Sequence, residues 1–425
     1  MNNPSGQTET TDARLIHQGL YYRLHGLRAL LGRPWVASVL RVAGWLLVVG
    51  WLFFVALVLL LRFAVLPSIA DYRADIERLA GKAVGQEVRI GQIAAHWRGL
   101  NPELVLDGVS LLAADGAPSF SLQRVDAVLS WHSLWRLRPV LALLSFDHPV
   151  LHVRRASDGR ISVAGIESTG DSDPAFAEWV LEQKRIRIHD ATIVWEDALR
   201  AAPPLILEDL QFGLDNRGQR HRFGLSAVPP AELAARIDLR GEINGDLHDA
   251  LERYAGNLYL ELEYADLAGW QPWFDYPVDL PRGRGGVRLW GEIKEGESRL
   301  TADLALQDLR IRLSRKLPAL DLDRLRGRLT ATYGKAAWSL AARQLELQTS
   351  EGIRLAPTDF QLDWRQGESA INGNFRANQL DLEILSRLAG YPPLDARSRE
   401  LLQAYAPQGR ISELRTSWGL QGEKL

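Results

Sequence analysis

Cysteine is absent from this chain, and its only methionine is the initiator. The protein therefore cannot form a disulfide, a cysteine-based zinc cluster or a thiol nucleophile. The sequence also lacks three motifs: the Gly-x-x-x-x-Gly-Lys-Ser/Thr loop of phosphate binding, the His-Glu-x-x-His helix of zinc-dependent hydrolases and the Gly-x-Ser-x-Gly elbow of acyl transfer. These absences predict a protein that is not an enzyme, with no catalytic residue, no metal ligand and no cofactor.

Two short clusters contain residue types that bind metals or phosphates in other proteins. His148 and His152 are four residues apart, but a metal site needs a third or fourth ligand, so we favour surface histidines. The run Gly283–Gly286 precedes a predicted strand and does not lead from a strand into a helix. We therefore interpret it as a turn and not as a phosphate-binding loop.

Acidic residues are missing between positions 13 and 70, and this region contains a long apolar run. Twenty uncharged, mostly apolar residues from Val42 to Leu61 lie between Arg41 and Arg62. At about 1.5 Å per residue the run spans about 30 Å, the thickness of a bilayer's hydrocarbon core. It predicts a single membrane-spanning helix.

The charges around this run predict its orientation. Five arginines precede it, so the positive-inside rule places the N-terminus in the cytoplasm and residues 63–425 outside. A cleavable signal peptide is the competing interpretation, but its apolar region would be about 7–15 residues long and would end at a small-residue cleavage site. Arg62 to Pro67 follow instead, which favours an uncleaved anchor. The outer part has a net charge of −6, which is a poor match for nucleic acid.

Beyond Glu87 the dominant hydrophobic period is two, as in half-buried strands. Turn dipeptides such as Asn244-Gly245 and Glu351-Gly352 separate the alternating segments at short intervals. This pattern predicts an antiparallel meander. Alternation is clearest in Leu258–Tyr264, Leu300–Leu306, Leu309–Leu313, Phe360–Trp364 and Leu380–Ile384.

The number of such segments favours an open sheet over a closed sandwich, because single cores stop growing near 250–300 residues. We expect an elongated, curled antiparallel β-sheet groove with a few short helices, and about twenty strands would give it a length of about 100 Å. One apolar face would then need a cover or a ligand. The candidate lining residues are Leu258, Leu260, Leu262, Leu300, Leu304, Leu306, Phe360, Leu362, Leu380 and Leu382.

Three segments have the spacing or capping of short helices. They are Pro67–Gly81, Pro174–Lys184 and Leu394–Ala406. We divide the chain into a basic cytoplasmic tail (residues 1–41), a membrane helix (42–61), a juxtamembrane helix with a first β module (62–166) and a continuing β-groove (167–425).

The residues after the predicted membrane helix resemble a known family. Asp71-Tyr72-Arg73 and then Val84–Ile93 running into His96–Val109 are similar to the start of the YhdP branch of AsmA-like proteins. The resemblance implies a bridge-like protein, anchored in the bacterial inner membrane, whose β-groove crosses the periplasm. The resemblance also implies that phospholipid acyl chains slide along the groove between the inner and outer membranes. By this transport the protein would take part in outer-membrane lipid homeostasis. It implies a periplasmic or outer-membrane partner at the C-terminal end.

Family members of this branch are usually several times longer. The resemblance therefore predicts that the chain is truncated at the C-terminus, as a fragment, a split gene product or a short homologue. An alternative function stays open from the sequence: an envelope assembly or scaffold protein that binds outer-membrane protein segments or a partner sheet edge.

Overall fold

A computed structural model describes residues 34–84, 87–112, 118–136, 139–163, 166–168, 179–245, 255–294, 296–366, 370–392, 394 and 396–421. The chain forms two compact units, Met1–Ile69 and Ala70–Leu425. Each is described by itself.

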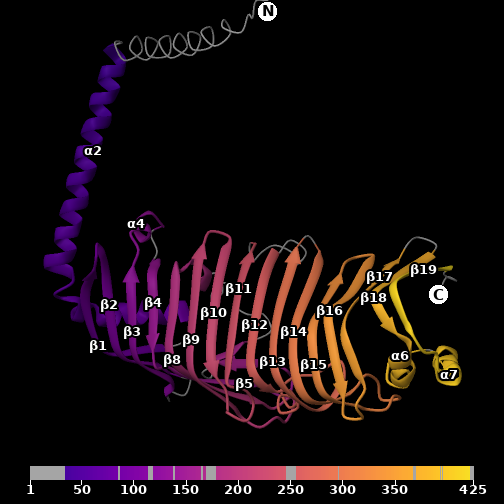
Figure 1. The fold of residues 1–425 in the computed structure, drawn as a ribbon. Coiled ribbons are helices and arrows are strands. Elements are labelled where there is room, and N and C mark those ends of the chain that lie inside the picture. The colour runs from indigo at the N-terminus through magenta and orange to yellow at the C-terminus, as the bar shows by residue number, and fades with distance from the viewer. Residues whose placement is uncertain are drawn as a thin grey trace, which may run out of the picture. The chain divides into compact units, whose positions relative to one another are not determined.

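The first unit contains the predicted membrane helix. Helix α2 spans Pro34–Leu60 and continues into a π-helical turn, Leu61–Val65 (Figure 1). The segment Arg41–Val65 is long and apolar enough to cross a membrane, and it is the only such helix among the described residues. The apolar helix therefore extends beyond both ends of the predicted span.

The second unit is one large, open, curled sheet (Figure 1). Its strands are β1 (Glu87–Arg98), β2 (Asn101–Leu112), β3 (Pro118–Leu129), β4 (Leu141–Asp147), β5 (Val150–Arg155), β6 (Ile161–Val163), β7 (Ile166–Ser168), β8 (Arg185–Asp197), β9 (Leu205–Arg217), β10 (Arg220–Val228), β11 (Arg236–Asn244), β12 (Ala255–Asp266), β13 (Asp279–Lys294), β14 (Glu297–Arg312), β15 (Leu320–Tyr333), β16 (Ala337–Thr349), β17 (Arg354–Gln366), β18 (Ala370–Asp381) and β19 (Arg410–Gln421). Its helices are α3 (Arg73–Val84), α4 (His132–Arg136), α6 (Leu382–Leu388) and α7 (Ala396–Tyr405).

Sequential strands pair antiparallel, as the alternation predicts, with one departure. Both β4 and β5 pair parallel with β8, β4 along its first half and β5 along its second. The two strands therefore share one position in the sheet, while β6 and β7 extend from β5. With this shared position the sheet is about 70 Å wide, shorter than the expected 100 Å. The predicted boundary at residue 167 stays a prediction.

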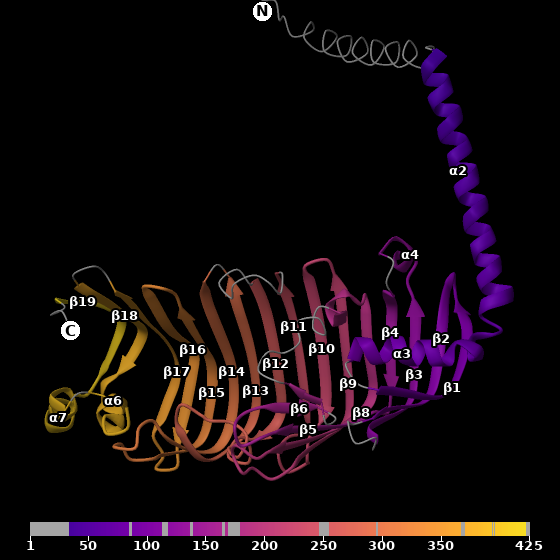
Figure 2. The same ribbon diagram turned by 180° about the vertical axis from the view of Figure 1, so that it is seen from behind.

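Helix α3 covers the first edge of the sheet. Its Ile76 and Ala80 pack against the buried cluster that includes Val88 and Ile90, and Figure 2 shows α3 in front of β2, β3 and β4. The Ile90 N–H of edge strand β1 donates to the Glu77 carboxylate (2.8 Å). Such cover prevents other strands from pairing with this edge. The helix was predicted to end at Gly81 but continues to Val84.

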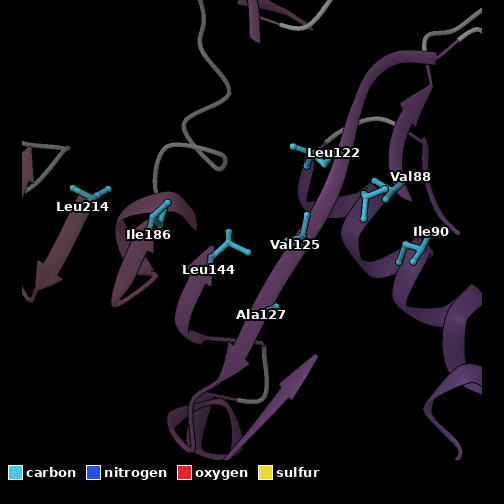
Figure 3. Close-up of a cluster of buried hydrophobic side chains, with 9 residues drawn as sticks. Val88, Ile90, Leu122, Val125, Ala127, Leu144, Ile186 and Leu214 are labelled. Atoms are coloured by element: carbon cyan, nitrogen blue, oxygen red, sulfur yellow. The ribbon is translucent and has the colours of Figure 1, made fainter. Parts of the chain in front are cut away.

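The same cluster extends along one face from β1 to β9. Figure 3 shows its side chains on these successive strands, where they form the packed core of the N-terminal end of the sheet. The buried members are Val88, Ile90, Val109, Leu122, Val125, Ala127, Leu144, Ile186 and Leu214.

A line of residues whose backbone has a positive φ, in the left-handed region, crosses most of the sheet. Such φ values are uncommon outside glycine, and Asp and Asn tolerate them best. They bend each strand, and they shift its apolar alternation by one residue, so that Leu306 is followed by Leu309 on the same side. We call this line the crease, and its non-glycine members are Asp190, Asp209, Tyr264, Asp308, Gln344 and Glu413.

Glycine serves the same line in β13. Gly285 has φ +147°, and a Cβ there would lie 2.1 Å from the Ala305 carbonyl oxygen. The run Gly283–Gly286 is therefore part of a strand and not the predicted turn. The close approach of two backbones explains why this position needs glycine.

The C-terminal helices differ in part from expectation. Strand β18 ends at Asp381, whose carboxylate caps α6 by accepting from the N–H groups of Glu383 and Ile384. The predicted strand Leu380–Ile384 is therefore wrong beyond Asp381, because a good N-cap starts a helix there. Helix α7 lies within the predicted helix Leu394–Ala406. Of the predicted helix Pro174–Lys184, residues 179–182 are helical and 174–178 lie outside the described residues.

Candidate functional site: an open apolar face

The strand register places apolar side chains in continuous rows across one face of the sheet. Directly opposite residues on paired strands point to the same face, so the pairing alone defines each row. The first row runs from β10 to β18 through Leu225, Leu239, Leu260, Leu289, Ala302, Leu329, Ala342, Phe360 and Ala377.

Two further rows lie on the same face, farther from the crease. The second consists of Phe223, Gly241, Leu258, Gly291, Leu300, Ala331, Leu340, Leu362 and Phe375. The third consists of Ile243, Gly256, Ile293, Ser298, Tyr333, Trp338, Trp364, Gly373 and Trp418. We call these three rows the apolar face.

The opposite face carries paired charges, and we call it the polar face. Arg288 contacts Glu261 across β12 and β13 (2.7 Å), and Arg328 contacts Asp303 across β14 and β15 (2.5 Å). Hydrogen bonds from Arg220 and Arg222 lower the pKa of Glu242 to about 2. This face is therefore suited to water, and each of these carboxylates has an arginine partner.

The apolar face is the concave side of the sheet. Leu306 and Leu309 flank the crease in β14, and both are buried in one cluster with Leu280 and Leu322. Side chains from both sides of the bend can share a cluster only if the strand folds toward the face that carries them. The bottom of the groove is thus filled by its own side chains.

Away from the crease the apolar face is open. Leu258 is 45% exposed, Leu300 50% and Leu340 37%. These leucines lie on alternate strands of the second row, with only Gly291 and Ala331 between them, so they belong to one apolar patch and are not isolated surface residues. Continuous exposed apolar surface marks a site that binds a partner or ligand.

The register also locates the predicted lining residues. Leu258, Leu260, Leu262, Leu300, Leu304, Leu306, Phe360 and Leu362 lie on the apolar side, and Leu306 among them is buried at the crease. Leu380 lies opposite Ile411 beyond the crease, while Leu382 is the first residue of α6 and not part of a strand. Contact of these residues with a ligand stays a prediction.

Sequence reasoning missed two open residues of this face. Tyr333 belongs to β15 and Leu340 to β16, and neither strand contains a segment in which alternation is clearest. The available signal was the spacing Trp338, Leu340, Ala342, in which one member is alanine. A small residue in the series weakened the pattern.

The histidine pair lies around the break between β4 and β5. His148 has φ +52° at the break between β4 and β5, and its Nε2 is 3.8 Å from Asp190 Oδ2. Within the described ranges no group of three or more His, Asp or Glu side chains is placed to hold a metal ion.

Comparison with known proteins gives one match. The model of the family described as YhdP protein matches residues 34–425. No curated protein and no solved structure matches the chain.

Proposed function

The chain belongs to the YhdP family, and on that premise we propose that it moves phospholipid between the inner and outer membranes of a bacterial envelope. In this proposal α2 is an uncleaved, single-pass anchor in the inner membrane, with the N-terminus in the cytoplasm and the sheet in the periplasm. The five arginines that precede the apolar run support this orientation.

The continuous apolar face is the observation that carries the proposal. From β10 to β19 it extends over ten neighbouring strands, about 43 Å at the usual strand spacing. Transfer of an acyl chain from a bilayer to water costs about 0.8 kcal/mol of free energy per methylene group. A groove lined by exposed leucines offers the chain an apolar surface and avoids most of this cost, so the lipid can leave the bilayer without its acyl chains entering water. The head group stays in solvent.

A photoreactive side chain in place of Leu300 tests this proposal, with Thr301 as the matched control. The two residues are adjacent in β14 but point to opposite faces, and Thr301 lies opposite Thr330 on the polar face. We expect phospholipid adducts from position 300 and none from 301 when the full chain is irradiated in bacterial envelopes. Adducts with polypeptide alone at position 300 would refute lipid transport.

A second candidate function is supported by the last strand. Among the described pairings β19 bonds to β18 alone, so its other edge is open to strand addition by a partner. In this alternative the chain is an envelope scaffold that holds an outer-membrane protein segment. Polypeptide adducts from a probe at Ser412 in β19, together with no lipid adduct at position 300, would favour it.

A further inference from the structure

Four aromatic side chains gather at the end of the apolar face that is farthest from the crease. The rings of Trp338 and Trp364 stack 5.7 Å apart at 15°, and Trp364 meets Trp418 edge-on at 6.2 Å. Tyr333 lies directly opposite Trp338 in the register. We call these four residues the aromatic rim. A Cβ at position 373 would lie 2.3 Å from the Trp418 ring, so Gly373 makes room for the last member.

The rim remains accessible although its members contact one another. Trp338 is 38% exposed and Tyr333 69%. A cluster that only filled a core would bury these rings, as Trp270 is buried at 5% exposure against Leu233 and Ala234. The aromatic rim therefore presents indole and phenol groups to whatever occupies the groove.

The distance from the rim to the crease is long enough to hold the hydrocarbon part of one lipid. Trp338 and Gln344 are six residues apart in β16, which corresponds to about 20 Å along the strand. One leaflet contributes half of a bilayer's hydrocarbon core, or about 15 Å. Leu340 and Ala342 lie between the two ends and offer only carbon to a ligand.

The rim end and the crease end of the apolar face differ chemically as the interface and the interior of a membrane leaflet do. Trp and Tyr collect where membranes meet water, because their rings are apolar and their N–H and O–H groups donate hydrogen bonds. The exposed Lys335 lies two residues beyond Tyr333, in the turn between β15 and β16, and its charge is complementary to a phosphate group. The crease end, in contrast, is a buried leucine cluster.

We propose that phospholipid lies parallel to the strands on β15 to β19, with its ester groups at the aromatic rim and its acyl ends at the crease. Movement along the groove is then a sideways step from one strand to the next, with all head groups on one side. This inference rests on the proposed function and adds the orientation of the lipid.

Two photoactivatable phospholipids that differ only in the position of a diazirine test the orientation. One carries it beside the ester and the other at the acyl terminus, and each is bound to the full chain in mild detergent before irradiation and peptide mapping. We expect the ester-side probe to label positions 333, 338 and 364, and the terminal probe to label Leu325, Leu345 and Leu347 near the crease. Identical or reversed labelling would overturn the orientation. A lack of adducts with either lipid on the apolar face would contradict the proposed function itself.

A pair of tryptophan substitutions adds a readout that does not depend on folding alone. Trp338→Leu keeps an apolar side chain but removes the indole, and we expect the share of ester-side adducts at the rim to fall at least twofold with total adducts unchanged. The control is Trp290→Leu, since Trp290 lies on the polar face opposite Thr301. An equal effect of both substitutions, or none from Trp338→Leu, would refute a role of the rim in positioning lipid.

Discussion

Substitution of Gly285 by alanine is the sharpest test of the crease. The residue has φ +147°, a conformation that costs an L-residue about 1–3 kcal/mol. The added Cβ would also lie 2.1 Å from the Ala305 oxygen and 2.9 Å from the Leu306 Cα, both backbone atoms. Strand β14 would have to move away, and each ladder hydrogen bond lost adds about 1 kcal/mol. We expect a total destabilisation of about 3–5 kcal/mol.

The measurement is urea unfolding of the full chain in mild detergent, followed by tryptophan fluorescence. With a slope of about 2 kcal/mol per molar, Gly285→Ala should lower the midpoint by about 2 M. Gly286→Ala is the matched control, because nothing lies within 4 Å of a Cβ at that position. Alanine there removes a strand glycine and should leave the midpoint unchanged or slightly higher. Equal midpoints for the two variants would refute the steric account of the crease.

Three further predictions concern the core, the polar face and the apolar face. Leu309→Ala removes a side chain that is 1% exposed at the crease and should cost about 2–5 kcal/mol in the same unfolding assay; a loss below 1 kcal/mol would show that the cluster is loosely packed. The folded-state pKa of Glu242 is lowered to about 2, so its arginine contacts stabilise the fold above pH ~4.3, and this stabilisation is lost as pH falls toward 2. Glu242→Gln should therefore lower the melting temperature at pH 7, and 1 M salt should reduce the difference in melting temperature between the variant and the wild type. An equal difference at pH 2 would contradict the linkage. Leu300→Asp places a charge against the acyl chains at a cost of about 3 kcal/mol, or a roughly 100-fold weaker retention of lipid; lipid mass spectrometry should show the loss, and Thr301→Asp should retain lipid.

The sequence was sufficient for the elements with a long, simple period. Twenty apolar residues predicted the helix that the structure extends to Pro34–Leu60, and alternation in Leu258–Tyr264 predicted the central part of β12. Both rest on local physics, because a period of two or an unbroken apolar run reports directly which side of an element is buried. The family resemblance to YhdP proteins is confirmed over residues 34–425.

Features that depend on contacts between distant parts of the chain, or on the capping of a helix, could not be predicted from periodicity. The parallel pairing of β4 and β5 with β8 depends on strands separated by a connection that alternation does not describe. The change from strand to helix at Leu382 depends on Asp381 acting as a cap, although the pattern Leu380, Leu382, Ile384 continues a strand period. Likewise, the aromatic rim brings together rings from β15, β16, β17 and β19, and only the register shows that they share a row.

The crease explains why one strand looked like two. Leu300–Leu306 and Leu309–Leu313 were separate alternating segments in the sequence, yet the single strand β14, from Glu297 to Arg312, contains the first and all of the second except Leu313. Without Asp308 in the left-handed region, the alternation on the second side of the bend would turn Leu309 outward and bring Asp308 into the groove.

The same sequence pattern occurs at three positions of the crease. Three segments place an aspartate directly before a buried apolar side chain and two residues after another apolar one. They are Ile188-His-Asp-Ala191, Leu207-Glu-Asp-Leu210 and Leu306-Gln-Asp-Leu309. A three-residue step between apolar positions is an error in a flat strand, but at an aspartate in the left-handed region it keeps the apolar side continuous around a bend. The irregular spacing is therefore what allows a single sheet to be both curved and apolar on its concave side, which is the condition for a groove that holds acyl chains.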